Sequence, residues 1–353
     1  MQDTEYREAG EGSDSGDALY GAVRSMRRSY ARYFLALIAY TAVAYFVIIA
    51  FELAAILIFN APEILSNIYV NWLLNTVPTY IFGFGVFYLI IRKMKTYGKE
   101  KSRITVPEFL ILFCIANLLM TVGALIGNLL NAQISALIGK EIKNDVSDMI
   151  ESTPIWLIIL VVVIIGPLIE ELLYRKFFID KLGFYNEGAA IITSALAFGL
   201  FHGNFYQFFY AFLLGIVLAA IYSKTRNLAY SYIMHALINF FGSVVSIFVM
   251  RAYEKYDECI KLIEAGKKCD PAVLAGSVLT IVFYLMVNYG TAIFGFVMLI
   301  RWRSRIFRKP DSDLLELSAP DCRAAIMKNI GVIAFTVLAV IQFAVGIIQS
   351  ALA

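Results

Sequence analysis

Long apolar runs separated by short polar segments make up most of the chain. Most of these runs hold about 20 residues, the length that crosses the hydrocarbon core of a bilayer as an α-helix. The pattern predicts about nine membrane spans, at residues 34–59, 72–91, 109–130, 155–179, 189–202, 206–222, 228–250, 273–300 and 330–351. The predicted fold class is therefore all-α, a polytopic helical membrane protein.

Composition agrees with this prediction and adds an orientation. Of the 353 residues, 60% are hydrophobic and 16% are charged. Lys and Arg cluster before the first span and after the second and eighth spans, so the positive-inside rule puts the N-terminus in the cytoplasm. Nucleic-acid binding has no support, because these clusters flank spans and form no interleaved basic and aromatic face. We expect an integral, multi-pass protein of a bacterial plasma membrane, in contact with the lipid bilayer.

The same pattern divides the chain into consecutive segments. Residues 1–30 begin acidic and polar, which predicts a disordered cytoplasmic tail. Membrane helices are expected over 31–153 and again over 272–353. Between them lie a core with ionisable residues inside its spans, 154–250, and an external loop, 251–271.

Two of the four cysteines, Cys259 and Cys269, share the predicted external loop. That compartment permits a disulfide between them. The sequence does not fix the geometry that the bond requires, so the bonded and the free state both stay open.

Two adjacent glutamates and an arginine fall inside the fourth span. A charged residue at membrane depth costs at least about 2.5 kcal/mol, so its default interpretation is functional. Glu171 and Arg175 are four residues apart on one helix face and are expected to pair. Glu170 is rotated by about 100° and is expected to keep its carboxylate free. Pro167, just upstream, removes a backbone hydrogen bond and predicts a kink in the helix beneath the pair.

Both histidines of the chain, His202 and His235, also fall inside spans. Phe198 precedes His202 by one turn, and Asn239 follows His235 by one turn on the same helix face. One such histidine is usually a hydrogen-bonded packing residue, whereas this set on three spans points to a site. Counted from the span ends, Glu170 and His235 lie about 14 Å deep and His202 about 20 Å deep. The predicted span boundaries therefore place His202 at a different depth from the other two side chains.

Glu170-Glu171-x-x-x-Arg175, Phe198-x-x-x-His202 and His235-x-x-x-Asn239 are, in this order, the three motifs of a known family. The chain resembles the CAAX-protease and bacteriocin-processing (CPBP) family of intramembrane proteases, which includes the type II CAAX prenyl endopeptidase. The resemblance covers residues 154–249, the CPBP-like core.

The resemblance implies an endopeptidase in which a glutamate activates water. Glu170 would be the general base, and His202 would hold the water. His235 and Asn239 would stabilise the oxyanion, with Glu171, Arg175 and Phe198 in support. A base, a water and oxyanion donors are also what the chemistry of peptide hydrolysis requires.

Zinc is the alternative within the enzyme reading. Glu170, His202 and His235 would make an acceptable ligand set with an open water position. Against it, the chain has no His-Glu-x-x-His helix, and one glutamate would have to be both ligand and base. We favour a mechanism that requires no cofactor.

Two other classes of function stay open. The ionisable residues would also suit a proton pathway in a transporter, although the sequence shows one polar cluster and no repeated halves. A protein of this type would also suit a non-proteolytic role, such as bacteriocin immunity. For the protease, the expected partner is a membrane-embedded or lipid-anchored peptide or protein.

Two smaller features are interpreted structurally. Gly123 and Gly127 have the small-residue spacing that allows close packing of two helices. Asn204 and Gln207 are expected to form hydrogen bonds between helices.

Overall fold

The computed structural model describes residues 3–58, 60–98, 100–142, 144–306 and 317–352. Within these residues every regular element is a helix, and no strand occurs. Eight helical runs are long and apolar enough to cross a membrane, and the apolar helix α9 (Glu187–Phe201) is shorter. The predicted all-α, polytopic class is confirmed, and the chain is an integral membrane protein.

The chain forms two compact units, each assembled from separate stretches of sequence. The first unit comprises Met1–Glu100, Leu173–Ser194 and Pro310–Gln342, and the second comprises Lys101–Leu172, Ala195–Lys309 and Phe343–Ala353. The segments expected from the sequence are consecutive, whereas the predicted core, 154–250, contributes to both units.

An aromatic core holds the first unit together. Its elements are α1 (Asp3–Leu57), η1 (Pro62–Ser66), α2 (Ile68–Val77), the π-helical η2 (Pro78–Gly83), α3 (Phe84–Ile91), α8 (Phe178–Leu182), α14 (Ala319–Met327) and most of α15 (Ile330–Leu352). The rings of Tyr33 and Phe87 meet edge to face, as do those of Tyr33 and Phe178. Phe178 also meets Tyr30 and Phe34 in this way. These contacts tie α1 to α3 and α8.

The predicted disordered tail, residues 1–30, is helical from Asp3 onwards in this structure. Its second half packs on the unit, because apolar side chains recur there on one face of α1: Met26 and Tyr30 are fully buried. The hydroxyls of Ser25 and Ser29 each share a hydrogen bond of 2.9 Å with the Tyr185 hydroxyl. These contacts explain why this half of the segment departs from the prediction.

The second unit contains α4 (Val106–Ile138), α5 (Asp145–Ser152), α6 (Ile155–Ile158), the π-helical η3 (Ile159–Ile165), α7 (Gly166–Glu171), α10 (Phe205–Thr225), α11 (Leu228–Asn239), the π-helical η5 (Phe240–Val245), α12 (Ser246–Glu264) and α13 (Pro271–Ile306). The π-helical η4 (Leu172–Phe177) follows α7.

A Cβ atom at Gly123 would collide with the backbone of Tyr210, and one at Gly127 with the carbonyl oxygen of Phe205. The two glycines therefore let α4 approach the start of α10, as their spacing predicts.

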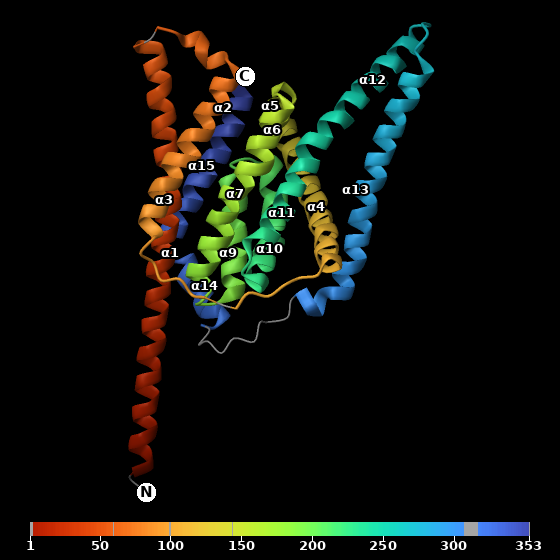
Figure 1. The fold of residues 1–353 in the computed structure, drawn as a ribbon. Coiled ribbons are helices and arrows are strands. Elements are labelled where there is room, and N and C mark those ends of the chain that lie inside the picture. The colour runs from red at the N-terminus through yellow and green to blue at the C-terminus, as the bar shows by residue number, and fades with distance from the viewer. Residues whose placement is uncertain (1–2, 59, 99, 143, 307–316, 353) are drawn as a thin grey trace. The chain divides into compact units, whose positions relative to one another are not determined.

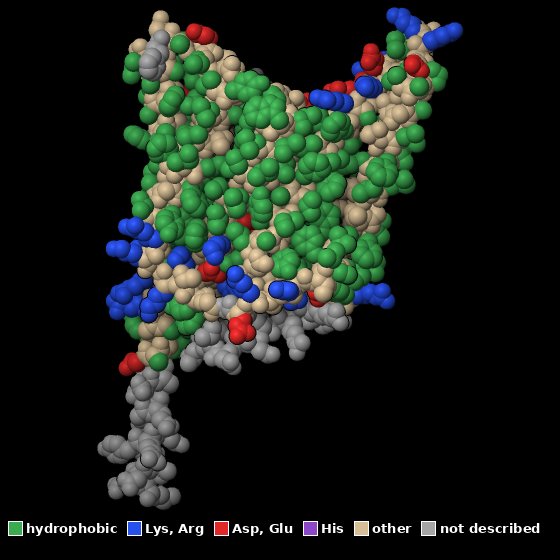
Figure 2. Space-filling model, in the orientation of Figure 1, with side chains coloured by type: hydrophobic (Ala, Val, Ile, Leu, Met, Phe, Trp, Pro, Cys, Tyr) green, Lys and Arg blue, Asp and Glu red, His purple; other side chains and the backbone are tan. Residues whose placement is uncertain are grey.

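The predicted external loop, 251–271, is mostly helix. α12 continues to Glu264 and α13 begins at Pro271, so the two form a hairpin with a short connection. Charged side chains gather at its tip, and hydrophobic side chains cover α13 beneath it (Figure 2). The prediction missed this helix because the predicted span ended where the apolar run ends. Beyond that point α12 stays helical because its residues are good helix formers, and Asp257 and Lys261 form an ion pair of 2.6 Å between successive turns.

Candidate functional site

The two glutamates lie on a short α-helical segment between two wider ones. α7 holds Glu170 and Glu171 at its end, with the π-helical η3 before it and the π-helical η4 after it. Pro167 lies in the first turn of α7, where its missing N–H and its ring disturb the preceding turn, and a π-helical turn accommodates such a disturbance. π-Helical turns of this kind are frequent at functional sites.

His235 of α11 meets both carboxylates. Its Nδ1 lies 3.0 Å from Oε1 of Glu171, and its Nε2 lies 3.5 Å from Oε2 of Glu170. α7 and α11 lie side by side (Figure 1), so one imidazole ring reaches two successive residues of α7. Glu170, whose carboxylate the sequence predicts to be free, thus lies beside one nitrogen of the ring while Glu171 contacts the other.

The three side chains differ in exposure, and this difference divides their roles. Glu171 is fully buried, and His235 is 3% exposed, whereas 22% of the Glu170 side chain is accessible. Nδ1–H of His235 donates to Glu171, so this bond fixes the ring, and Nε2 faces Glu170. The 3.5 Å separation is longer than an ordinary hydrogen bond, so Glu170 is the carboxylate of this trio that a water or substrate can reach.

Arg175 is fully buried and belongs to the first unit, whereas Glu171 belongs to the second. The pairing of Glu171 with Arg175 stays a prediction.

Asn239 closes α11, directly before the π-helical η5. Its amide nitrogen donates to the carbonyl oxygen of Val162 in η3 at 2.9 Å. This bond joins the fourth and seventh spans one turn beyond the histidine, and it uses one of the two amide N–H groups. Sequence reasoning assigned Asn239 to an oxyanion and missed this bond, since no signal in the sequence shows that the Val162 carbonyl accepts it.

His202 lies just after α9, where Gly203 turns the chain with a φ of 66°. Its Nδ1 lies 2.8 Å from the carbonyl oxygen of Phe198, which accepts only, so Nδ1 carries the proton of this bond. The Phe198 ring meets the ring of His202 edge to face at 4.9 Å and that of His235 at 5.6 Å. One phenyl ring thus contacts both imidazoles.

A metal site requires ligands that converge on one point. Among the residues that the structure describes, no three His, Cys, Asp or Glu side chains come together closely enough to hold a metal ion. The predicted zinc set of Glu170, His202 and His235 is thus not assembled here, and metal dependence stays a question for experiment.

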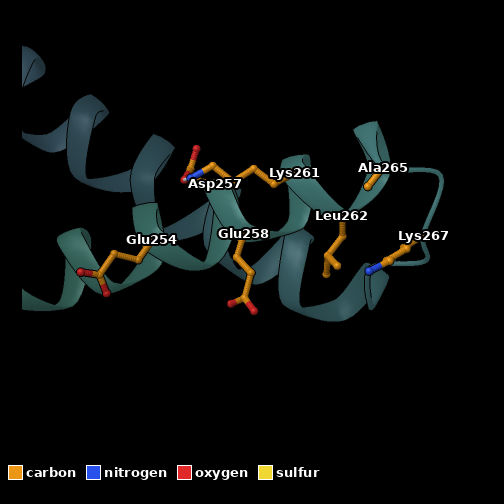
Figure 3. A pocket seen from close by; sticks show the side chains of 7 residues that line it. All are labelled: Glu254, Asp257, Glu258, Lys261, Leu262, Ala265 and Lys267. Carbon is orange, nitrogen blue, oxygen red and sulfur yellow. The ribbon is translucent and has the colours of Figure 1, made fainter.

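The tip of the α12–α13 hairpin carries two further features. Cys259 and Cys269 are joined there by a disulfide. A shallow cavity of about 430 Å³ opens beside it, lined by Glu254, Asp257, Glu258, Lys261, Leu262, Ala265 and Lys267 (Figure 3). Its lining includes none of the motif residues, and Asp257 and Lys261 already neutralise each other within it, so we assign no chemistry to it.

The comparisons with known proteins concern the part of the chain that holds this geometry. Residues 152–241 match the family model described as type II CAAX prenyl endopeptidase Rce1-like. This range contains all three motifs, from Glu170 to Asn239, and the resemblance to the CAAX-protease family is confirmed for it.

Three curated proteins are similar. The putative membrane peptidase YdiL of Bacillus subtilis is 27% identical over 136 residues, which are 36% of this chain and 54% of YdiL. The UPF0177 protein YxdF of Lactococcus lactis is 33% identical over 97 residues, 27% of this chain and 54% of YxdF. The membrane-embedded CAAX protease MroQ of Staphylococcus aureus is 27% identical over 176 residues, 47% of this chain and 68% of MroQ. The chain thus spans about half the length of the first two relatives. No solved structure matches it.

Proposed function

Taking as the premise that residues 152–241 form an Rce1-like CAAX-protease domain, we propose that this protein is an intramembrane endopeptidase. It hydrolyses peptide bonds of membrane-embedded or lipid-anchored substrates with a water molecule that Glu170 activates. The observation that carries the proposal is the contact of one buried imidazole, His235, with both glutamates of the first motif.

Glu170 is the general base in this mechanism. It is the more accessible of the two glutamates, and it lies beside a nitrogen of His235 in an otherwise apolar helix. The oxygen of the water forms a bond to the carbonyl carbon, and its proton passes to Glu170. The same proton then leaves with the amine when the C–N bond breaks, so the glutamate is regenerated.

The two histidines have different tasks. The lone pair on Nε2 of His202, fixed by the bond from Nδ1–H to Phe198, accepts a hydrogen bond from the water and orients it. Glu171 orients His235 through Nδ1 so that Nε2 points to the reacting oxygen, and an N–H at Nε2 in the transition state donates to the oxyanion. The second amide N–H of Asn239, the one not bonded to Val162, supports the same oxygen.

Burial gives this arrangement its strength. Polar groups that are fixed in an apolar helix bundle stabilise a developing charge more than they would in water, because no solvent has to reorganise. The transport alternative lacks a comparable observation, since among the described residues His235 meets one pair of glutamates and no second such cluster is seen along the spans.

The test is cleavage of a library of quenched fluorescent membrane peptides by the detergent-purified full chain, with and without a zinc chelator. The Glu170→Gln variant, purified in parallel, is the control for contaminating proteases. We expect cleavage by the wild type that survives chelation and is absent in the variant. Cleavage lost on chelation and restored by zinc would replace the metal-free mechanism with a zinc enzyme, and equal cleavage by the variant would refute the assignment of Glu170.

A further inference from the structure

The backbone hydrogen bonds of the fourth span change at Pro167. In the π-helical η3, each backbone N–H reaches the carbonyl oxygen five residues earlier. The N–H of Gly166 closes this element with a bond to the carbonyl oxygen of Val161. The next bond in the same register would join residue 167 to Val162, but proline has no N–H. η3 therefore ends where Pro167 leaves the Val162 carbonyl without a π-helical donor.

α11 donates to the fourth span at this interruption. The amide nitrogen of Asn239 lies 2.9 Å from the Val162 carbonyl oxygen, so it takes the place of the N–H that the proline lacks. The hydroxyl of Tyr232, on the same helix, donates to the carbonyl oxygen of Ile164 at 3.4 Å. Both acceptors lie just before Pro167. Within a membrane span such carbonyl groups depend on protein donors, because no water is at hand to replace them.

The same face of α11 also contacts the span beyond the proline. His235, one turn before Asn239, has its Nδ1 3.0 Å from Oε1 of Glu171. α11 thus contacts the fourth span at Val162 before Pro167 and at Glu171 after it. Two contacts on opposite sides of one residue fix how far α11 slides along the span and how it is rotated. The position of the imidazole therefore depends on the contact at Val162 as well as on the glutamates.

A proline in a membrane helix often does no more than bend it, and a neighbouring helix then satisfies the freed carbonyl group. Pro167 differs in the identity of the donor. Asn239 belongs to the third motif, and it shares a helix face with the histidine that meets both glutamates. The missing N–H is thus connected, through one hydrogen bond and one helix, to the residues of the proposed site.

We propose that Pro167 is a positioning residue of this site. By lacking an N–H it keeps the Val162 carbonyl open to Asn239, and that bond sets the register of α11 on the fourth span. The register in turn holds His235 between the two glutamates. The inference rests on the proposed endopeptidase function and adds to it a residue that acts through α11 without touching the substrate.

The test is Pro167→Ala in the full-length chain, with kcat, KM and Tm measured on one preparation. The restored N–H should bond Val162 within the helix and displace the Asn239 amide, so that His235 loses its register. We expect kcat to fall about tenfold or more with KM unchanged. The Tm should not fall, because alanine is a far better residue than proline inside a helix.

Pro154→Ala is the matched control on the same span. Pro154 directly precedes α6, where a backbone N–H would have no partner within the helix. We expect this variant to keep kcat within about twofold of the wild type and to leave the Tm unchanged. A loss of kcat equal to that of Pro167→Ala would show a general effect of removing a proline and would overturn the inference.

A thermal cycle tests the exchange of donors without relying on activity. Asn239→Leu should lower the Tm in the wild type, because Val162 loses its donor. In Pro167→Ala the same substitution should lower the Tm by about half as much or less, since the new N–H remains. Equal Tm shifts in the two backgrounds, an unchanged kcat in Pro167→Ala, or a kcat loss accompanied by a lower Tm would overturn this inference and leave the endopeptidase proposal intact. Absence of any Glu170-dependent cleavage by the wild type would overturn the endopeptidase proposal and the positioning role with it.

Discussion

The run from Leu228 to Glu264 is one continuous helical stretch, and its two halves hold polar side chains under opposite conditions. In the first half His235 is 3% exposed and contacts two glutamates, and Asn239 donates to a backbone carbonyl. In the second half Asp257 and Lys261 form an ion pair with each other, and their side chains are 45% and 72% exposed.

The difference shows which polar contacts of this molecule depend on a fixed geometry. A polar group in an apolar bundle must have a partner with fixed geometry, because leaving it without one costs about 1–3 kcal/mol or more. An exposed ion pair is screened by water and contributes less than about 1 kcal/mol. Substitutions in the first half should therefore change both folding and activity, and those at the tip of the hairpin should change little.

His235→Ala should have the largest effect. It removes the imidazole that Glu171 contacts inside the bundle, and a buried polar group that loses its hydrogen-bond partner costs about 1–3 kcal/mol or more. We expect a low yield of folded protein, a lower Tm and no cleavage. A variant that unfolds at the wild-type temperature would contradict the role of this contact, and detergent-purified protein in a thermal scan measures it.

Glu171→Gln should reduce cleavage by about 10²–10⁴-fold while preserving most of the fold. The amide retains the shape of the carboxylate but no longer fixes the proton of His235 on Nδ1, and loss of such a fixed tautomer is costly in catalytic triads. The measurement is kcat on a cleaved peptide, with Glu187→Gln as a control at a buried glutamate outside the motifs. Equal losses in the two variants would indicate a general effect of buried charge.

Asn239→Leu should lower stability by about 1–2 kcal/mol, because the Val162 carbonyl loses its donor within the membrane. Cleavage should fall as well, since the same amide is assigned to the oxyanion. Asn239→Asp keeps the shape but lacks both N–H donors, so it should lose stability and cleavage as well. A variant with full activity and reduced stability would restrict Asn239 to joining η3 and α11.

Substitutions at the hairpin tip should have the smallest effects. Asp257→Asn and Lys261→Gln should each change stability by less than about 0.5 kcal/mol. Cleavage should stay within about twofold when Cys259 and Cys269 are both replaced by Ser. In native membranes we expect the two cysteines to resist thiol labelling until a reductant is added. Equal labelling with and without reductant would show that they are free.

The sequence predicts the helical class, the spans and the three motifs because each depends on local pattern. Apolar runs of membrane length are visible without any structure, and ionisable residues inside them stand out by their cost. The i, i+4 spacing of His235 and Asn239 places both on one face, and the structure gives each a contact on the fourth span.

The sequence could not predict the partners across helices. Which nitrogen of His235 meets which glutamate depends on the rotation of α11 against α7. Similarly, the bond from Asn239 to Val162 requires a carbonyl in the π-helical η3. The extension of α12 was missed because hydropathy marks the edge of a membrane and not the end of a helix.

The central claim is that Glu170 is the base of a membrane endopeptidase, and one measurement tests it most directly. The wild type and Glu170→Gln are compared at equal concentrations in the same detergent, with kcat/KM on a cleaved peptide and Tm measured on the same preparations. We predict a loss of at least about 10³-fold in kcat/KM with an unchanged Tm, since the side chain is partly accessible and the substitution is isosteric. Activity of the variant within tenfold of the wild type would contradict the claim.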